Sequence, residues 1–478
     1  MPHPFQCIAY AKSGNDSASI LLAACGHKLL STTASPNALI SSWSAANTID
    51  ASANDDDHAE QPKKKQKTEV PVQSLLNIIK LTISPDSRHV VAVTEDKHVR
   101  VFALDQKNTL LELSERILPK RPCALQVLPD NRTILVGDKF GDVYSLPLLP
   151  SAEEDAAAAA AKAEKQAAKT FKPSASNLTV HSKRNLESLE SQMRQRQFTP
   201  RKEALAFVHQ LLLGHVSMLT DALFIQTQTL QGNRSRGYII TADRDEHIRI
   251  SRGPPQSHII EGFCLGHTNF ISKLCLAGTD TLVSGGGDDW IGVWDWKSFS
   301  LRGKVNIRSA IVRALATEGK TADDVQVAVS NLLSVPAVIS GKPSEIVVAI
   351  CEGVKALFVF DSSELLIKKE ESVEVTTLPL EAQPVDLMRF DSDRAFFVVS
   401  LDQREEGSSG LKAYSIAAGA GTADGDFSIV SCNGVDAKLR TLCEATADVP
   451  VDDKKTNGLL YSIANLRKRG GWDQDNDG

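Results

Sequence analysis

The sequence predicts an all-β fold: a seven-bladed β-propeller of about seven four-stranded units, with one helical or disordered insertion. One observation is a twelve-residue block that occurs twice without a gap, TADRDEHIRISR at 241–252 and SGGGDDWIGVWD at 284–295. A second is the Gly-His pair ahead of each block, at 214–215 and 266–267, which sets a repeat of 52 residues. The third is a series of weaker copies along the chain. Repeats of this length built from short strands are typical of propellers.

Each weaker copy reads as a strand, a tight turn and a second strand. Residues 21–43 supply two short strands that end at Trp43. Residues 94–102 and 137–146 follow, with Asp96 and Asp138 in their turns. After the two aligned blocks, strand pairs without an acid are predicted in EIVVAICEGVKALFVFD (345–361), AFFVVSLDQ (395–403), GLKAYSI (410–416) and GLLYSIANL (458–466).

The domain organisation follows from the places where the repeat is interrupted. Residues 51–70 carry an acidic run, then a basic run, and almost nothing apolar, so a disordered loop is expected there. Residues 151–203 begin with an alanine-rich stretch typical of an exposed helix and continue with a basic stretch. The predicted segments are first propeller strands (1–50), charged loop (51–70), early blades (71–150), insertion (151–203), remaining blades (204–466) and a basic then acidic tail (467–478).

The second aligned block resembles a WD repeat, because Gly266-His267 is followed by Trp294-Asp295 after the spacing of that repeat. The resemblance implies a buried hydrogen-bonded chain of His267, Ser284, Asp288 and Trp294. Such a chain stabilises a blade only when every member is satisfied.

In the preceding blade the corresponding residues are His215, Thr241 and Asp245, and Ser251 stands where the tryptophan is expected. Asp245 is therefore predicted to be a structural acid of the turn, paired with His215, rather than a catalytic residue. The network of this blade is predicted to be incomplete.

A more specific resemblance lies in ADRDEHIRIS, followed by IEGFCLGHTNFISKLCL and SGGGDDWIGVWDW. These stretches, with VGDKFGDVYSL and LYSIANLRKRG, are similar to the non-catalytic WD-repeat subunit of tRNA (guanine-N(7)-)-methyltransferase. The resemblance implies a propeller that binds and stabilises a separate Rossmann-type subunit as a heterodimer. That subunit would bind S-adenosylmethionine and form N(7)-methylguanosine in the tRNA variable loop.

The same resemblance implies where the catalytic subunit binds. The partner-facing basic position of the family falls on Arg249, with Arg244, Glu246 and His247 beside it. Strand residues alternate between faces, so an inward Ile248 turns His247 and Arg249 outward together. A guanidinium suits a partner carboxylate because it forms paired, charge-assisted hydrogen bonds. The alternative interpretation is a solvated, charged turn.

No motif in the chain predicts catalysis or a cofactor of its own. The nearest approach to a nucleotide-binding loop is GAGTADG at 419–425, and neither an amphipathic helix nor a βαβ pattern accompanies it. The eight cysteines are scattered without a CxxC pair, so neither a zinc site nor any other metal site is expected. S-adenosylmethionine is expected on the partner subunit.

Basic residues gather locally in a chain whose net charge is -6. Residues 62–67, PKKKQK, fit either a nuclear-localisation signal or a solvated loop, and nuclear localisation is predicted. Arg467, Lys468 and Arg469 follow the last predicted strand. Because the family's tail lies near bound tRNA, the resemblance implies a phosphate contact there. No stretch is long and apolar enough to predict a membrane span.

The prediction from these observations is a non-enzymatic partner subunit of a tRNA methyltransferase that meets tRNA through the complex. The alternative is a WD-repeat scaffold of another kind, such as the substrate receptor of a ubiquitin ligase. An autonomous enzyme is the third class and the least supported, because no cofactor loop is present in the sequence. Co-purification separates the first two, since each requires different partners.

Overall fold

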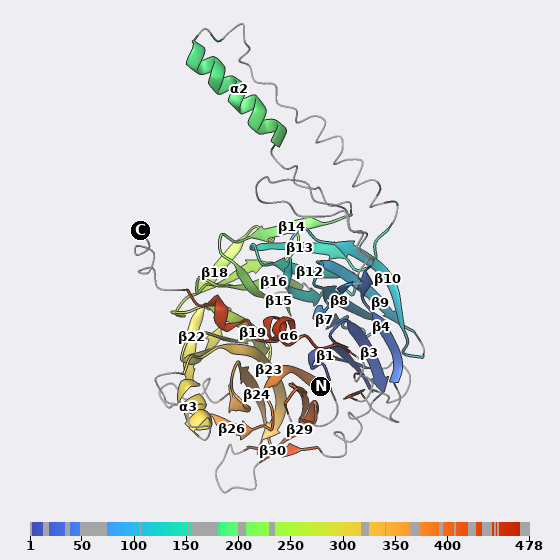
Figure 1. Ribbon diagram of the computed structural model, residues 1–478. Coiled ribbons are helices and arrows are strands. Elements are labelled where there is room, and N and C mark those ends of the chain that lie inside the picture. Colours follow the sequence, from blue (N-terminus) through green and yellow to red (C-terminus); the bar gives the residue numbers. More distant parts are fainter. Residues whose placement is uncertain are drawn as a thin grey trace, which may run out of the picture.

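Seven four-stranded antiparallel sheets and one two-stranded sheet make up the strand structure of the described chain. Figure 1 shows the sheets arranged as blades around a central axis. The computed structural model describes residues 2–12, 19–33, 39–47, 74–105, 107–151, 153, 156, 180, 182–198, 207–228, 235–316, 325–339, 341–363, 373–391, 395–405, 408–418, 427–432, 442–443, 446 and 449–468.

The first four blades take their strands consecutively from the chain, with the inner strand first. Blade 1 contains β1 (Phe5–Lys12), β2 (Ser19–Cys25), β3 (Lys28–Thr33) and β4 (Leu39–Ser44). Blade 2 contains β7 (Ile78–Ile83), β8 (His89–Thr94), β9 (His98–Leu104) and β10 (Leu110–Ile117). Blade 3 contains β11 (Pro122–Val127), β12 (Thr133–Asp138), β13 (Asp142–Pro147) and β14 (Gln210–Gly214). Blade 4 contains β15 (Leu219–Gln228), β16 (Ser235–Asp243), β17 (Ile248–Arg252) and β18 (Ile260–Cys264).

The remaining blades follow the same rule. Blade 5 contains β19 (Ile271–Ala277), β20 (Thr281–Gly286), β21 (Trp290–Asp295) and β22 (Ser300–Asn306). Blade 6 contains β23 (Val329–Ile339), β24 (Lys342–Cys351), β25 (Ala356–Asp361) and β26 (Thr376–Pro379). Blade 7 contains β27 (Pro384–Asp391), β28 (Ala395–Leu401), β29 (Leu411–Ala418) and β30 (Phe427–Ser431). The two-stranded sheet pairs β5 (Ala46–Asn47) with β6 (Ser74–Leu75), and helix α3 (Arg308–Ala316) links blades 5 and 6.

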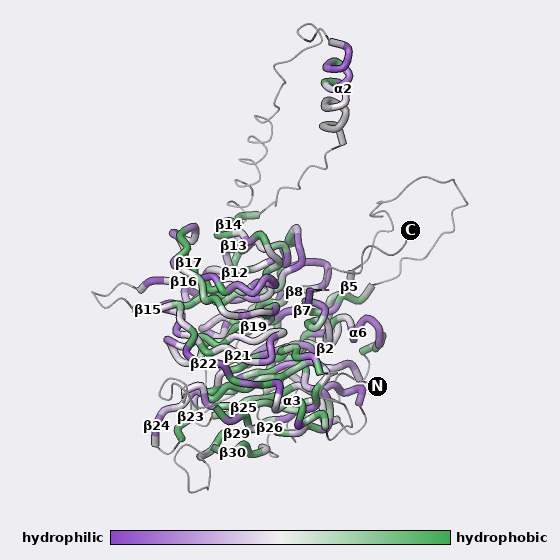
Figure 2. The backbone as a smooth tube through the Cα atoms, turned by 90° about the vertical axis from the view of Figure 1, so that its left-hand side faces the viewer, coloured by the Kyte–Doolittle hydropathy of each residue, from purple (hydrophilic) through white to green (hydrophobic). Residues whose placement is uncertain are grey.

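The core lies between neighbouring blades. The second strand of each blade is apolar along much of its length, because a strand packed on both faces has no solvent side. In β20 every residue from Thr281 to Gly286 is buried. Between blades 5 and 6, Val283 and Val293 pack in one cluster with Val347 and Phe358. Figure 2 shows hydrophobic stretches running through the stacked blades.

The ring closes between blades 1 and 7 without exchanging a strand, since each sheet is built from strands consecutive in sequence. The inner strands β1 and β27 lie side by side at this seam. The Ile8 amide donates to Asp386 Oδ2 at 2.8 Å. The rings of Tyr10 and Phe390 have centroids 4.5 Å apart. The seam is therefore held by side-chain packing and by side-chain hydrogen bonds.

The predicted all-β, seven-bladed propeller is confirmed, but the predicted strand pair at 458–466 is wrong. This segment forms the end of helix α6 (Asp453–Leu460) and the short 3-10 helix η2 (Ala464–Leu466). Asp452 begins α6 by accepting the amides of Lys454 and Lys455, as an N-cap aspartate does. The last described propeller strand ends at Ser431.

The insertion between β13 and β14 contains helix α2 (Lys183–Phe198), which lies in its basic second part. Figures 1 and 2 both show α2 standing away from the ring. The alanine-rich stretch, apart from isolated residues, and the charged loop at 51–70 lie outside the described residues. No helix within the described ranges has the length and apolar character required to cross a membrane.

Candidate functional site

The turn between β16 and β17, residues 243–247, is organised by the carboxylate of Asp243. Asp243 is the last residue of β16, and its Oδ1 accepts the amides of Asp245 at 2.9 Å and His247 at 3.0 Å. Glu246 has a φ of 75°, which places its backbone in the left-handed region. One of the charged residues in this turn, Asp243, therefore has a structural role, because its carboxylate holds the backbone of the turn in place.

In blade 5 the four residues of the WD repeat form one buried chain. His267 Nδ1 lies 2.7 Å from Asp288 Oδ2, and His267 Nε2 lies 2.7 Å from Ser284 Oγ. Trp294 Nε1 donates to the same serine oxygen at 2.7 Å. Asp288 also accepts the amide of Thr268 at 3.1 Å. Burial opposes ionisation of Asp288, but the hydrogen bonds from His267 and Thr268 outweigh it and hold the pKa of this carboxyl below its usual value.

In blade 4 the predicted pairing of His215 with Asp245 is wrong. His215 Nε2 lies 2.8 Å from Thr241 Oγ1, as expected, but the acid beside His215 Nδ1 is Asp243, at 3.6 Å. Asp243 occupies the position of Gly286 in blade 5. A Cβ at Gly286 would lie 1.9 Å from the Phe270 carbonyl oxygen, so blade 5 cannot carry an acid there.

In blade 5 the acid that bonds to the histidine is therefore Asp288, two residues beyond Gly286. In blade 4 it is Asp243, the last residue of β16. Asp245, which aligns with Asp288, turns outward instead and lies 3.0 Å from Lys468 Nζ. That hydrogen bond lowers the pKa of the Asp245 carboxyl. The positions correspond in sequence, and backbone crowding at Gly286 excludes a structural acid from the strand end of blade 5.

Arg249 occupies space that belongs to a tryptophan in the neighbouring blade. At Gly292, its counterpart in blade 5, an added Cβ would lie 2.6 Å from Trp294 Nε1. In blade 4, Ser251 replaces the tryptophan and leaves room for a long side chain at 249. Arg249 Nε donates to Ser251 Oγ at 3.0 Å, and Nη1 donates to the Gly214 carbonyl at 3.0 Å. The incomplete network and the half-buried arginine therefore both follow from the replacement of the tryptophan by Ser251.

Exposed apolar side chains lie on the strand paired with this arginine and on the loops near its bonding partners. Phe263 pairs with Arg249 across the strands, and its ring lies 6.4 Å from that of His247. Leu265 follows two residues later and is exposed, as is Val216, next to the Gly214 and His215 loop. Phe140 is 65% exposed on the turn of blade 3, and the next residue in that turn bonds to His215. We call Phe140, Val216, Phe263 and Leu265 the apolar rim.

The segment after α6 lies against the same turns. Arg244 Nε donates to the Leu466 carbonyl at 2.8 Å, and Lys468 Nζ lies 3.2 Å from Glu246 Oε1. Arg467 Nη2 donates to the Gly287 and Val327 carbonyls at 2.9 and 3.0 Å. Of the predicted tRNA-contacting residues, Arg467 and Lys468 thus make contacts within the chain, and Arg469 lies outside the described residues.

This C-terminal segment, residues 453–468, is the main feature of the surface that sequence reasoning missed. It is anchored on blade 7, where Tyr461 Oη donates to Asp402 Oδ2 at 2.7 Å and Arg404 Nη2 donates to the same oxygen at 2.6 Å. On blade 6, the Glu352 carboxylate accepts the amide of Ile463 at 2.7 Å. The N-cap aspartate was the available sequence signal, but the apolar run after it resembled a strand.

Replacing Tyr461 with phenylalanine should loosen the C-terminal segment. The change removes a hydrogen bond to an ionised carboxylate, and such bonds contribute about 2 kcal/mol. We expect faster cleavage by trypsin at Lys454, measured on the folded protein. Tyr144→Phe is the matched control, because its hydroxyl bonds to Asp142 in blade 3, away from the segment. Equal cleavage rates for Tyr461→Phe and the wild type would contradict this anchoring.

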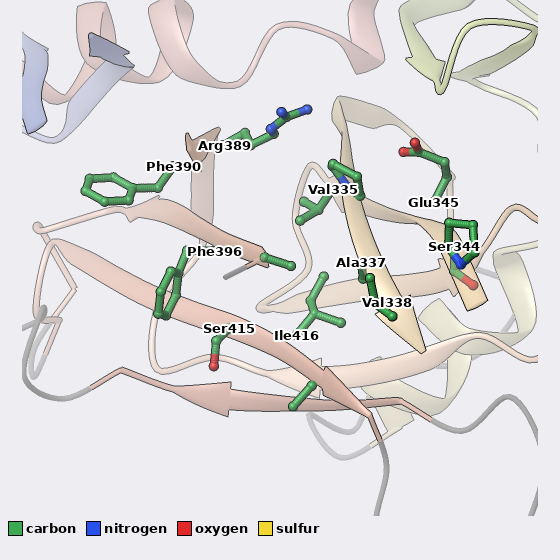
Figure 3. Close-up of a pocket in the computed structure, with 14 residues that line it drawn as sticks. Val335, Ala337, Val338, Ser344, Glu345, Arg389, Phe390, Phe396, Ser415 and Ile416 are labelled. Carbon is green, nitrogen blue, oxygen red and sulfur yellow. The ribbon is translucent and has the colours of Figure 1, made fainter. Parts of the chain in front are cut away.

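A separate cavity of about 670 Å³ lies between blades 6 and 7 (Figure 3). Its lining is mostly apolar, with Val335, Phe396 and Ile416 among the side chains, and Glu345 and Arg389 are its charged lining residues within the described chain. This lining contains no group of residues arranged for catalysis. Across the described residues, no cluster of histidine, cysteine and acidic side chains is arranged to hold a metal ion.

Comparison with known proteins assigns the chain to a family. The family model described as the tRNA methyltransferase TRM82 WD40 domain matches residues 21–417. A relative from Phaeosphaeria nodorum, named tRNA (guanine-N(7)-)-methyltransferase non-catalytic subunit TRM82, is 40% identical over 98% of this chain and 99% of its own length. A relative from Sclerotinia sclerotiorum with the same description is 41% identical over 86% of this chain and 80% of its own length.

The fold has more distant likenesses among solved structures. The crystal structure of RRP9 WD40 repeats matches with a TM-score of 0.51 and 12% identity, covering 85% of this chain and 89% of that one. This likeness supports the propeller architecture alone. The extent and identity of the sequence matches confirm the resemblance first seen in DRDEHIRIS: the chain belongs to the family of WD-repeat proteins named as non-catalytic subunits of tRNA (guanine-N(7)-)-methyltransferase.

Proposed function

We propose that this chain binds and stabilises a separate methyltransferase subunit that forms N(7)-methylguanosine in the tRNA variable loop. Its relatives carry the name of the non-catalytic subunit, and a non-catalytic subunit acts through a catalytic partner. The observation that carries the docking site is the environment of Arg249, a half-buried guanidinium at the edge of an exposed apolar rim. The partner would bind there as one half of a heterodimer.

Arg249 is suited to an acidic partner residue. Burial lowers the pKa of this guanidinium, and none of the described residues pairs a carboxylate with it. Its two internal bonds, to Ser251 and the Gly214 carbonyl, use two of the five donors that an arginine offers. The remaining donors can form charge-assisted bonds with a carboxylate of the catalytic subunit. The internal bonds also hold the side chain in place before the partner arrives.

The apolar rim supplies the contact area that a single ion pair lacks. Stable interfaces combine aromatic and arginine anchors near their centre with a polar margin. Phe140 and Phe263 fit the role of anchors, and Arg244, Glu246 and His247 fit the role of the margin. Two of these three, Arg244 and Glu246, are already held by the C-terminal segment. The side chains of Arg244 and Glu246 would therefore already be held in position when the partner binds.

The proposal has three further parts. S-adenosylmethionine binds to the catalytic subunit, and tRNA meets this chain only within the complex, where Arg467, Lys468 and Arg469 lie at the end of the C-terminal segment. The complex acts in the nucleus, for which the basic run at 62–67 is the sequence support. That run and the loop at 419–425 lie outside the described residues.

The test is co-expression of this chain with the catalytic subunit, followed by purification and assay. We expect the two chains to co-purify, and the complex to bind S-adenosylmethionine and methylate tRNA. The isolated propeller should do neither, because its described surface contains no constellation for that cofactor. Saturable binding of S-adenosylmethionine by the propeller alone would contradict the proposal. Co-purification with ubiquitin-ligase components in place of a methyltransferase would also contradict it.

A further inference from the structure

The long hairpin of blade 6 projects beyond the rest of its sheet. β23 and β24 pair as far as Ile339 and Lys342, whereas β25 pairs with β24 only as far as Asp361 opposite Ile346. Residues 336–339 and 342–345 therefore overhang β25. This overhang forms one wall of the cavity of about 670 Å³ between blades 6 and 7, and the ends of β27 and β29 belong to the other wall. The volume falls within the range of about 300 to 1,000 Å³ that is usual for binding pockets.

Arg389 brings a positive charge to this cavity from blade 7. On the same strand, Leu387 packs in a cluster with blade 6, and Met388 and Phe390 pack in a cluster with blade 1. Residues of a strand alternate between its faces, so Arg389 lies on the blade 6 side with Leu387. Figure 3 shows its side chain among the lining residues. Arg389 is exposed, and none of the described residues forms a hydrogen bond or an ion pair with its guanidinium.

Glu345, the other charged lining residue of the described chain, is already bonded. Its Oε2 accepts the hydroxyl of Ser334 at 2.7 Å. A Cβ at Gly278 in blade 5 would lie 3.6 Å from its Oε1, whereas the next residue, Ile346, packs toward blade 7. The carboxylate of Glu345 is therefore held on the blade 5 side of the hairpin. A molecule that enters the cavity would meet the positive charge of Arg389.

The rest of the lining is mostly apolar, with Val335, Ala337 and Ile416 among its residues. Two prolines of the hairpin, Pro336 and Pro343, also line the cavity and have no amide hydrogen to donate. β23 is an edge strand of its sheet, and a proline on an edge strand opposes the addition of another strand. An occupant of this cavity would therefore be held through its side chains rather than through strand pairing.

We propose that this cavity docks a short segment of another protein in which a large apolar side chain stands next to an acidic residue. The apolar side chain would fill the cavity, and the acid would form charge-assisted hydrogen bonds with Arg389. Because Arg389 is exposed, the acid would lie at the mouth of the cavity, where a bound chain can continue into solvent. Val338, which is 69% exposed on the hairpin, extends the apolar contact to the mouth, as a polypeptide ligand requires.

The cavity lies at the opposite end of the ring from the surface around Arg249. Strands alternate in direction within each blade, so the turns between first and second strands lie at one end and those between second and third strands at the other. The hairpin of β23 and β24 is of the first kind, and the turn at 243–247 is of the second. Figure 2 shows this hairpin and α6 at opposite ends of the ring. A segment docked here leaves the Arg249 surface free, so this site does not depend on the proposed function.

The experiment selects binders from a displayed library of random short peptides on the immobilised full chain and measures the affinity of the most enriched peptide by fluorescence anisotropy. The enriched peptides should share a large apolar residue next to an acidic one. Arg389→Glu reverses the charge at the mouth, and Val338→Glu places an acid on the apolar wall. Each should weaken binding at least about tenfold. Both residues are exposed, so both variants should remain folded.

Arg132→Glu is the matched control, because Arg132 is an exposed arginine in the turn between β11 and β12, at the same end of the ring. It should bind the peptide as the wild type does. The proposal would be overturned by a lack of enrichment, by enriched peptides without the paired acid and apolar residue, or by unchanged binding to Arg389→Glu and Val338→Glu. A dimer in light scattering that Val338→Glu dissociates would assign the cavity to a second copy of this chain instead. Saturable binding of decanoate without enrichment of any peptide would assign it to a small amphiphile.

Discussion

Replacing Arg249 with glutamate should abolish stable association with the catalytic subunit while the propeller remains folded. Reversing the charge at a desolvated interface pair removes the attraction and adds repulsion, typically several kcal/mol. Within the chain, the change removes the bonds to Ser251 and Gly214, so we also expect a loss of about 2 kcal/mol in the free energy of unfolding. The measurements are a titration of the two subunits and circular dichroism of the propeller alone.

Three further variants separate the interface from the fold. Arg249→Lys keeps the charge but loses the planar fork, so it should weaken association less than the glutamate does. Ser251→Ala removes an internal acceptor of Arg249 and should leave association close to that of the wild type. Arg252→Glu reverses a charge on the same strand, where the native side chain pairs with Glu261, and serves as the matched control. Undiminished association of a folded Arg249→Glu protein would show that the stretch is only a charged turn.

Replacing Asp288 with alanine should lower the free energy of unfolding by about 3 kcal/mol. The side chain of Asp288 is 2% exposed and accepts hydrogen bonds from His267 and from the amide and hydroxyl of Thr268. Alanine leaves the buried His267 ring without its acceptor and also removes the acceptor of the Thr268 amide and hydroxyl. Urea denaturation followed by tryptophan fluorescence measures the loss, because Trp294 ends the same hydrogen-bonded chain.

Asp289→Ala is the control for this change. Its side chain is 60% exposed and pairs with Arg308 at 3.2 Å, and an exposed pair of this kind contributes about 0 to 1 kcal/mol. The Asp289 carbonyl, which accepts the amides of Ile307 and Arg308, is retained in alanine. Equal losses for Asp288→Ala and Asp289→Ala would contradict the buried network.

The effect of Asp288→Ala should also depend on pH. The folded pKa of Asp288 lies below the ordinary value of 3.8, so the carboxylate contributes its full stability above that pH. The contribution falls as the pH drops below 3.8 toward and through the folded pKa. The difference between wild type and Asp288→Ala should therefore be largest near neutral pH and shrink in acid. A difference that grows in acid would contradict this assignment.

The sequence predicts the repeat and the network of blade 5 because both depend on local residue types at fixed spacing. Ser284 and Trp294 are placed by the pairing of β20 with β21, and His267 by the loop that precedes β19. The acid of blade 4 could not be predicted in this manner. Whether the strand end can bear it depends on the space beside the start of the inner strand of the same blade, as the crowded Cβ position at Gly286 against Phe270 and Ile271 shows.

Two other features depend on contacts between distant parts of the chain. The C-terminal segment reads as a strand in sequence, and its helix is specified by the Asp452 cap and by the carboxylates of blades 6 and 7 that it meets. Lys80 and Lys273 lie in ordinary strand patterns far apart in sequence. Only closure of the ring places both residues in the lining of one central cavity, so no local pattern in the sequence indicates this arrangement.

The ring closes between blades 1 and 7 without exchanging a strand, and this has a consequence for folding. Ile8 and Asp386, which meet there, are 378 residues apart, and closing a loop of that length costs about 5 kcal/mol of chain entropy. Each blade gains its strand pairing from near neighbours, so the seam is the step that must wait for the whole chain. Because the entropic cost rises only with the logarithm of loop length, inserts such as the one carrying α2 add little to it. The contacts of β1 with β27 therefore determine whether the blades remain an open arc or become a ring.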